Sequence, residues 1–167
     1  MKPPFHLFDW INENKHLLKP PVGNKNLYVA SQDYIVMIVA GPNARTDFHY
    51  NETEELFYQL QGDIELHLQI ENKREIVSIK EGEMYLLPAK IPHAPSRKAN
   101  TVGLVIERKR ANSTYKDGLL WFCKNCNHLL YEVYFELENI ELDFLKHFNY
   151  YNENKELHCC KNCNTEN

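Results

Sequence analysis

Residues 64–70 of the chain read IELHLQI, with an apolar side chain at every second position. Ile64, Leu66 and Leu68 share one face of an extended chain, and the polar side chains between them share the other. Because successive side chains of a β-strand point to opposite faces, this alternation predicts a strand that covers a hydrophobic core with one face. The β-branched run of residues 34–40 (YIVMIVA) predicts a second strand.

Further short segments of this kind follow, separated by turn residues. Strands are predicted at residues 56–60, 75–79, 84–87, 102–106 and 130–137. Many short strands at close spacing indicate an antiparallel sandwich or barrel rather than βαβ units. Apolar residues at helical spacing predict a short amphipathic helix within residues 5–18, ended by Pro20-Pro21, and another helix is expected near residues 140–150.

The composition narrows the class of protein. The chain has 167 residues, 43% of them hydrophobic, which suits one folded domain with a small appendage. Its net charge of −4 leaves no basic surplus for a phosphate backbone, so no nucleic-acid partner is expected. No apolar run approaches the ~20 residues of a membrane span, and residues 1–10 lack the features of a secretion signal. We therefore expect no membrane association and a cytoplasmic location.

The composition changes after Lys109. Residues 110–118 (RANSTYKDG) are polar and rich in turn formers, and they predict a linker. All five cysteines lie beyond this segment. We therefore expect a barrel at residues 1–109 and, at residues 110–167, a linker and a cysteine-bearing extension that packs on the barrel.

Two blocks of sequence contain residues that bind metals. In residues 41–62 (GPNARTDFHYNETEELFYQLQG), His49 is followed six residues later by Glu55. In residues 82–97 (GEMYLLPAKIPHAPSR), His93 stands just after a proline turn. A lone histidine is more often a surface or core residue, but two imidazoles and a carboxylate together bind a divalent metal and leave one face of it open. Iron(II) with open positions would serve oxygen chemistry, whereas a redox-inactive metal would serve hydrolysis or isomerisation.

The spacing of these residues resembles the two motifs of the cupin superfamily, G-x5-H-x-H-x3,4-E-x6-G and G-x5-P-x-G-x2-H-x3-N. The resemblance implies an all-β fold, the double-stranded β-helix or jelly-roll barrel, here with a short N-terminal helix and a small C-terminal four-cysteine extension. The chain departs from the motifs in the placement of Gly41, two residues too far upstream, and at three other positions: Asn51 for the second histidine, Lys90 for a glycine and Arg97 for the final asparagine. The usual three histidines and a glutamate thereby become two histidines and a glutamate.

Longer stretches are more specific than these motifs. Four of them resemble 3-hydroxyanthranilate 3,4-dioxygenases: residues 16–25 (HLLKPPVGNK), 41–62, 86–97 (LLPAKIPHAPSR) and 103–110 (GLVIERKR). The resemblance covers nearly the whole chain. It implies that both atoms of dioxygen open the ring of 3-hydroxyanthranilate to give 2-amino-3-carboxymuconate semialdehyde. That product closes to quinolinate, the precursor of the nicotinamide ring of NAD.

The resemblance also implies roles for individual residues. The positions that match the ligands of a catalytic iron(II) are His49, Glu55 and His93. Glu55 also counts among the catalytic and substrate-binding residues. Arg45 is implied to lie beside bound dioxygen, while Arg97 and Glu107 are implied to hold the substrate.

The chemistry of these side chains suits those roles. A substrate carboxylate requires a fixed cation, and Arg97 offers a bidentate fork four residues beyond His93. Arg45 could stabilise negative charge that grows on reduced oxygen. Glu107, at the end of a predicted strand, could orient an arginine or accept a substrate proton. Without the resemblance, solvated surface charge would be the ordinary interpretation of Arg45, Arg97 and Glu107.

The tail contains two C-x2-C pairs, Cys123 with Cys126 and Cys160 with Cys163, and 33 residues separate the pairs. Paired knuckles of this spacing predict a tetrahedral four-thiolate site for iron or zinc. Because four protein ligands leave no open position for a substrate, this second metal is predicted to be structural. Cys159 is left as a spare thiol. Similar tails in the resembled family bind a rubredoxin-like iron that is remote from catalysis.

Three functions stay open at this point. The first is the ring-opening dioxygenase, with 3-hydroxyanthranilate and O2 as its small-molecule partners. The second is a metal-dependent cupin isomerase or hydrolase that uses zinc or manganese. The third is a non-catalytic cupin binding module with a zinc ribbon, which would not need His49, Glu55 and His93 together. Exposed sheet edges and the resembled family both favour a homodimer.

Overall fold

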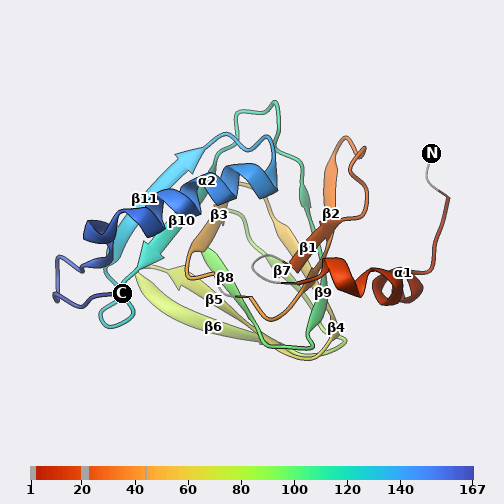
Figure 1. Cartoon of the computed structure of the whole chain (residues 1–167), viewed down its shortest axis with the longest axis horizontal. Helices are drawn as coiled ribbons and strands as arrows, with labels where there is room; N and C mark the ends of the chain where they lie inside the picture. Colours follow the sequence, from red (N-terminus) through yellow and green to blue (C-terminus); the bar gives the residue numbers. More distant parts are fainter. Residues whose placement is uncertain (1–2, 20–22, 44) are drawn as a thin grey trace.

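Two antiparallel β-sheets form the body of the chain in the computed structural model, which describes residues 3–19, 23–43 and 45–167 (Figure 1). The five-stranded sheet runs in the order β1 (Gly23–Asn26), β2 (Tyr34–Ala40), β9 (Val102–Arg108), β4 (Glu55–Gln61) and β7 (Met84–Leu87). The six-stranded sheet runs in the order β11 (Leu129–Phe135), β10 (Asp117–Phe122), β3 (Phe48–Asn51), β8 (His93–Arg97), β5 (Ile64–Ile70) and β6 (Lys73–Ile79).

The strands with clear apolar patterns are those that the sequence predicted. Residues 34–40, 64–70 and 84–87 form β2, β5 and β7 with the predicted bounds. The core cluster of buried residues draws on both sheets, with Leu66 of β5 and Phe57 of β4 among its members. The prediction of an all-β double-stranded β-helix of the cupin type is confirmed.

Two helices flank the sheets. The predicted N-terminal helix is α1 (Leu7–Asn14), followed by the 3-10 turn η1 (Lys15–Leu17), and Pro20-Pro21 lie outside the described residues. The predicted tail helix is α2 (Ile140–Glu153), which leads to a second 3-10 turn, η2 (Lys155–His158). No helix within the described ranges is long and apolar enough to cross a membrane.

The tail joins the larger sheet directly. β10 pairs with β11 on one side and with β3 on the other, while α2 lies across β10 and β11 (Figure 1). Phe144 and Tyr151 of α2 pack on Leu119 and Trp121 of β10 in a core cluster of their own. The tail and the barrel therefore share one continuous sheet, and the division placed at residue 109 stays a prediction.

Candidate metal centre and substrate pocket

Two histidines and one glutamate from both sheets meet inside the barrel. His49 on β3 and His93 on β8 are directly opposite each other in the larger sheet, and Glu55 begins β4 in the smaller sheet. All three side chains are buried, and their ligand atoms lie within 4.8 Å of one another. The residues predicted to bind the catalytic metal are therefore brought together.

The donor atoms fit a divalent cation. The carbonyl oxygen of Ile91 lies 3.0 Å from His93 Nδ1 and can only accept, so Nδ1 carries a proton, and in the neutral ring that binds a metal Nε2 keeps a free lone pair. This Nε2 lies 3.1 Å from Glu55 Oε2. Although the contact is close, Oε2 is buried and has no hydrogen-bond partner among the described residues. Since buried polar atoms rarely lack a partner, a divalent metal between the two side chains would account for the orphaned oxygen.

Burial and charge set the protonation of the three ligands. Burial lowers the pKa of His49, and this effect outweighs the charge of Asp117. Burial also lowers the pKa of His93, but the nearby carboxylate of Glu55 reverses the shift and raises it. Burial would raise the pKa of Glu55, yet the charge of His93 brings it down to about 2. Glu55 is therefore an anion at neutral pH, which is the form that binds a metal.

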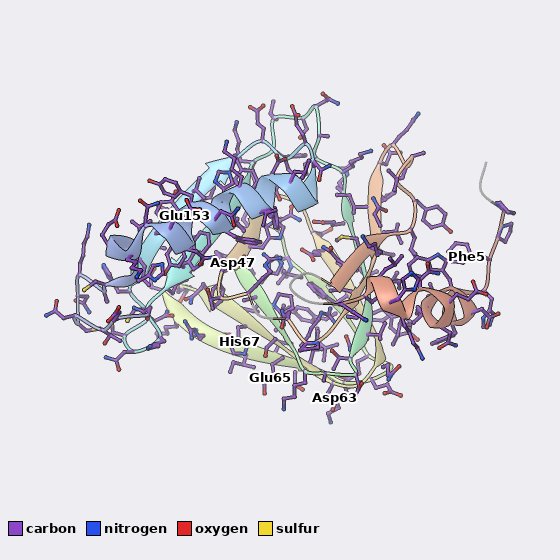
Figure 2. All side chains as sticks on the ribbon, in the orientation of Figure 1. Phe5, Asp47, Asp63, Glu65, His67 and Glu153 are labelled. Atoms are coloured by element: carbon purple, nitrogen blue, oxygen red, sulfur yellow. The ribbon has the colours of Figure 1, made fainter. Side chains whose placement is uncertain are left out.

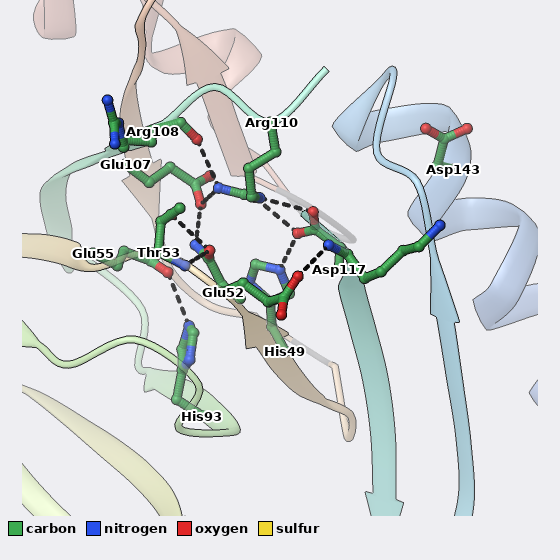
Figure 3. A network of polar contacts seen from close by, with 12 residues as sticks. His49, Glu52, Thr53, Glu55, His93, Glu107, Arg108, Arg110, Asp117 and Asp143 are labelled. Carbon is green, nitrogen blue, oxygen red and sulfur yellow. Dashed lines mark hydrogen bonds and ion pairs between the residues drawn. The ribbon is translucent and has the colours of Figure 1, made fainter. Parts of the chain in front are cut away.

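A buried chain of polar contacts leads away from His49 (Figure 3). Asp117 Oδ1 lies 2.7 Å from His49 Nε2, and both Asp117 oxygens accept hydrogen bonds from Arg110. Arg110 Nη1 also donates to Glu107 Oε2, at 2.9 Å. The same oxygen accepts a 2.9 Å hydrogen bond from Asn51 Nδ2. Asn51, which replaces a motif histidine, therefore orients a carboxylate at this point of the barrel.

Arg97 is a buried cation that forms no ion pair with the described residues. Its side chain is only 4% exposed, and its Nη1 donates to Gln59 Oε1 at 3.1 Å. Its Nε has no hydrogen-bond partner, and within the described part of the chain no acidic side chain forms an ion pair with it. Burial lowers the pKa of Arg97 to about 10, so the guanidinium still carries its charge at neutral pH. Such a group is suited to receive an anion from outside the chain.

Arg45 is held quite differently. Its Nε donates to Asp47 Oδ1 at 2.9 Å, and Asp47 Oδ2 accepts a second hydrogen bond from the guanidinium. Asp47 lies beneath α2 inside the molecule, whereas Asp63, Glu65 and His67 lie on the opposite side of the barrel (Figure 2). The Arg45 guanidinium also lies 5.2 Å and 4.9 Å from the ring centres of Phe144 and Phe148. Arg45 is therefore fixed by a carboxylate and by the aromatic face of α2.

Glu107 faces Glu55 across β9 and β4, where the two are directly opposite residues. Burial, followed by the charge of Glu55, raises the pKa of Glu107 to about 7, although Arg110 opposes the shift. A carboxyl group with this pKa can exchange a proton near neutral pH.

All six predicted residues of the catalytic site line one cavity of about 260 Å³: Arg45, His49, Glu55, His93, Arg97 and Glu107. Its apolar walls come from Met37, Val39, Phe57 and Val105 of the barrel and from Phe144, Leu145 and Phe148 of α2. The cavity therefore combines candidate metal ligands, the cation of Arg97 and apolar walls, and this combination suits a small planar acid. The structure brings the six residues together around one cavity, and their roles in a site remain predictions.

Comparison with known proteins agrees with this site. Residues 1–152 match the family described as 3-hydroxyanthranilic acid dioxygenase. The chain belongs to this family. A 3-hydroxyanthranilate 3,4-dioxygenase from Xanthomonas campestris pv. campestris (strain B100) is 48% identical over 96% of this chain and 90% of its own length. One from Bacillus thuringiensis (strain Al Hakam) is 48% identical over 95% of this chain and 88% of its own.

Among solved structures, a cupin-2 domain containing protein from Shewanella frigidimarina has a TM-score of 0.48 and 19% sequence identity. The match covers 59% of this chain and 92% of that protein.

In this member of the 3-hydroxyanthranilic acid dioxygenase family, the four predicted cysteines also meet. Cys123 Sγ lies 3.6 Å from Cys163 Sγ, and Cys126 Sγ lies 3.5 Å from Cys160 Sγ. These distances are well beyond the roughly 2.05 Å of a disulfide, and all four sulfur atoms lie within 4.8 Å of one another. The cluster fits a four-thiolate metal site, while Cys159 is exposed and outside it.

The two cysteine knuckles have the same local structure. The sequence CKNCN occurs at residues 123–127 and 160–164, and each copy ends in an asparagine with positive φ, 59° for Asn127 and 57° for Asn164. Asn125 Nδ2 donates to Cys163 Sγ at 3.6 Å, and Asn162 Nδ2 donates to Cys126 Sγ at 3.5 Å. Each knuckle therefore supplies a hydrogen bond to a sulfur of the other, which favours the thiolate form that binds a metal.

Sequence patterns did not reveal every residue of the site. The cysteine cluster does not line the cavity, but α2 of the same tail forms one of its walls through Phe144, Leu145 and Phe148. The tail is therefore not wholly remote from the site. Arg110 and Asp117 lie in the stretch that the sequence assigned to a polar linker, and both are buried. Their charge is equally common on a solvated loop, and although Arg110 ends the stretch 103–110 that resembles the family, no sequence pattern assigned a role to either residue.

Proposed function

We propose that the chain is a non-haem iron(II) dioxygenase that opens the ring of 3-hydroxyanthranilate with both atoms of O2. The product is 2-amino-3-carboxymuconate semialdehyde, which closes to quinolinate for NAD biosynthesis. The observation that carries this proposal is the buried Arg97, which forms no ion pair with a described residue, in the same cavity as His49, Glu55 and His93. The activity named for relatives that are 48% identical over most of the chain supports it.

Iron(II) is the metal that suits the proposed reaction. The proposed ligands are His49, Glu55 and His93, and two histidines with one carboxylate leave positions open on iron(II). Iron(II) held by these residues would supply the electron-transfer chemistry that lets dioxygen react with an aromatic ring. The apolar walls of the cavity, including Phe57 and Phe148, exclude water from that reaction.

The buried charges of the cavity are matched to a small anion. Arg45 is paired with Asp47, and Arg110 is paired with Glu107 and Asp117. Arg97 lines the cavity and forms no ion pair with a described residue. The fitting place for a substrate carboxylate is therefore against Arg97.

Two further side chains take part in the proposed reaction. Glu107 accepts the proton of the substrate hydroxyl, since it lines the cavity beside Glu55. Arg45 stabilises negative charge as dioxygen is reduced, and Asp47 with Phe144 keeps its guanidinium in place.

The four-cysteine site takes iron or zinc and has a structural role in this proposal. Its support is the closed set of Cys123, Cys126, Cys160 and Cys163, which leaves no position for a substrate. Thiolates that bind a metal must be reduced, which suits the proposed cytoplasmic location.

The proposed homodimer has a suitable surface in the outer face of the smaller sheet. Val36, Ile106, Leu56 and Leu86 are consecutive cross-strand partners and form an apolar row across four strands. Leu86 at the end of the row is 53% exposed. A second copy of the chain would bury this row. Analytical ultracentrifugation measures the oligomeric state.

Oxygen uptake separates the proposed function from its rivals. The protein is prepared without oxygen, its metal content is measured, and 3-hydroxyanthranilate is added to the iron(II)-loaded form. The dioxygenase consumes one O2 for each substrate. An isomerase or hydrolase that uses zinc or manganese would consume none, and a binding module would leave the substrate unchanged.

A further inference from the structure

We propose that Asp117 and Arg110 are positioning residues for the metal centre. Asp117 fixes the tautomer and ring orientation of His49, and Arg110 ties this ligand to Glu107 in the opposite sheet. The part that concerns His49 rests only on metal binding by this cavity, whereas the part that concerns Glu107 rests on the proposed function.

The hydrogen bonds of Asp117 determine which His49 nitrogen carries the proton. Arg110 Nε donates to Asp117 Oδ2 at 2.7 Å, and Arg110 Nη2 donates to Asp117 Oδ1 at 2.8 Å. A carboxylate bound in this bidentate way is ionised and has no proton to give. His49 Nε2, 2.7 Å from Oδ1, is therefore the donor, and the lone pair of His49 Nδ1 is left free for a metal.

This arrangement differs from that of the other histidine ligand. His93 donates through Nδ1 to the backbone carbonyl of Ile91 and keeps the lone pair of Nε2. His49 instead depends on a carboxylate that comes from another strand, 68 residues away in sequence. A histidine bound to a carboxylate is a stronger donor to a metal, because the partial negative charge of the carboxylate increases the basicity of the ring.

Arg110 joins this carboxylate to the substrate side of the cavity. Its side chain is fully buried, and its Nη1 donates both to Glu107 Oε2 at 2.9 Å and to the Arg108 carbonyl at 2.7 Å. Glu107 belongs to β9 of the smaller sheet and Asp117 to β10 of the larger one (Figure 3). One planar guanidinium thus fixes the separation of two carboxylates, one behind a metal ligand and one lining the cavity.

Cobalt(II) titration of the full chain tests the role of Asp117. We expect Asp117→Asn to weaken Co(II) binding in the barrel by about 10- to 100-fold, the usual effect of losing an outer-shell carboxylate. The visible ligand-field bands of the barrel Co(II) should shift as well. The sulfur-to-cobalt charge-transfer bands of the four-cysteine site serve as an internal control and should stay unchanged. A folded variant with wild-type affinity and wild-type bands would overturn the proposal.

Two more variants separate positioning from simple stabilisation. Thr101→Val removes a buried hydroxyl group that donates only to the Lys98 carbonyl, and it should leave barrel Co(II) affinity unchanged even if it lowers Tm. Arg110→Lys keeps the charge but loses the planar fork. It should lower both Co(II) affinity and kcat/KM, because one ammonium cannot hold both carboxylates. If neither quantity changed in Arg110→Lys, Arg110 would have no positioning role.

The tautomer of His49 can be measured in the wild-type protein. This test therefore does not depend on whether a variant folds. In the zinc-loaded chain with ¹⁵N-labelled histidine, His49 should show a metal-bound Nδ1 and a protonated Nε2. His93 should show the reverse. A metal-bound Nε2 in His49 would refute the role of Asp117. If the expected tautomer is found but 3-hydroxyanthranilate is not oxidised, the proposed function fails while the positioning role stands.

Discussion

Replacing Arg97 by methionine removes the guanidinium and keeps most of the side-chain stem. Arg97 is only 4% exposed and lies in the cavity, so a substrate carboxylate bound to it is largely desolvated. The loss of one partner from such a pair costs roughly 2–4 kcal/mol. This corresponds to about a 30- to 1,000-fold fall in kcat/KM for 3-hydroxyanthranilate.

The same substitution should not weaken the fold. Among the described residues Arg97 has no ion pair and its Nε has no hydrogen-bond partner, so much of the free-energy cost of burying its charge is not recovered in the substrate-free chain. The hydrogen bond from its Nη1 to Gln59 Oε1 is lost in the variant and offsets part of that gain. We therefore expect the Tm of Arg97→Met to lie close to that of the wild type. A loss of binding with no loss of stability is typical of a group kept for its ligand.

Steady-state kinetics on two substrates supply the assay. 2-Aminophenol has the adjacent hydroxyl and amine but no carboxylate, so Arg97→Met should change its kcat/KM little. Arg74→Met serves as a matched control, because Arg74 is exposed and is not part of the cavity wall. An equal loss on both substrates, or a clear fall in Tm, would refute the assignment of Arg97 to the carboxylate.

Other substitutions test neighbouring parts of the account. Gly103→Ala would place a Cβ 2.8 Å from Gln59 Oε1 and 2.9 Å from Arg97 Nη1, so both side chains should shift, KM for 3-hydroxyanthranilate should rise and Tm should fall because the site is crowded. His93→Ala should remove the barrel metal, measured by elemental analysis, and abolish ring cleavage while the tail metal remains. Replacing Cys123 and Cys126 together by serine should lower Tm, measured by calorimetry, because metal binding contributes folding energy. Turnover per barrel iron should stay near normal well below that Tm, with a raised KM because α2 lines the cavity.

The strands that the sequence predicted share a simple pattern of hydrophobicity, whereas two of the missed strands, β3 and β8, have polar residues inside. Residues 64–70 alternate apolar and polar side chains, and β5 has the same bounds. β3 (FHYN) and β8 (HAPSR) turn histidine, asparagine and arginine side chains toward the barrel interior, where they are buried. A pattern of hydrophobicity does not identify a strand whose inner face is polar.

The residues of the candidate site likewise include some that the sequence predicted and some that it missed. His49 and His93 were predictable because the spacing of metal ligands is preserved within each block of sequence. Arg110 and Asp117 were assigned to a polar linker, and only tertiary structure brings them together as a buried pair. β10 begins at Asp117, so a strand of the barrel sheet starts where the sequence suggested a turn. The cavity wall supplied by α2 was equally hidden, because an aromatic face on a tail helix is usually packed core.

The fate of labelled dioxygen tests the central claim most directly. The iron(II)-loaded protein is mixed with 3-hydroxyanthranilate under ¹⁸O₂, and the ring-opened product is trapped before its aldehyde exchanges oxygen with water. The account predicts two ¹⁸O atoms in each product molecule, one O2 consumed for each ring opened, and no reaction in His93→Ala. Incorporation of one atom or none, or unchanged turnover in His93→Ala, would contradict a dioxygenase built on this metal site.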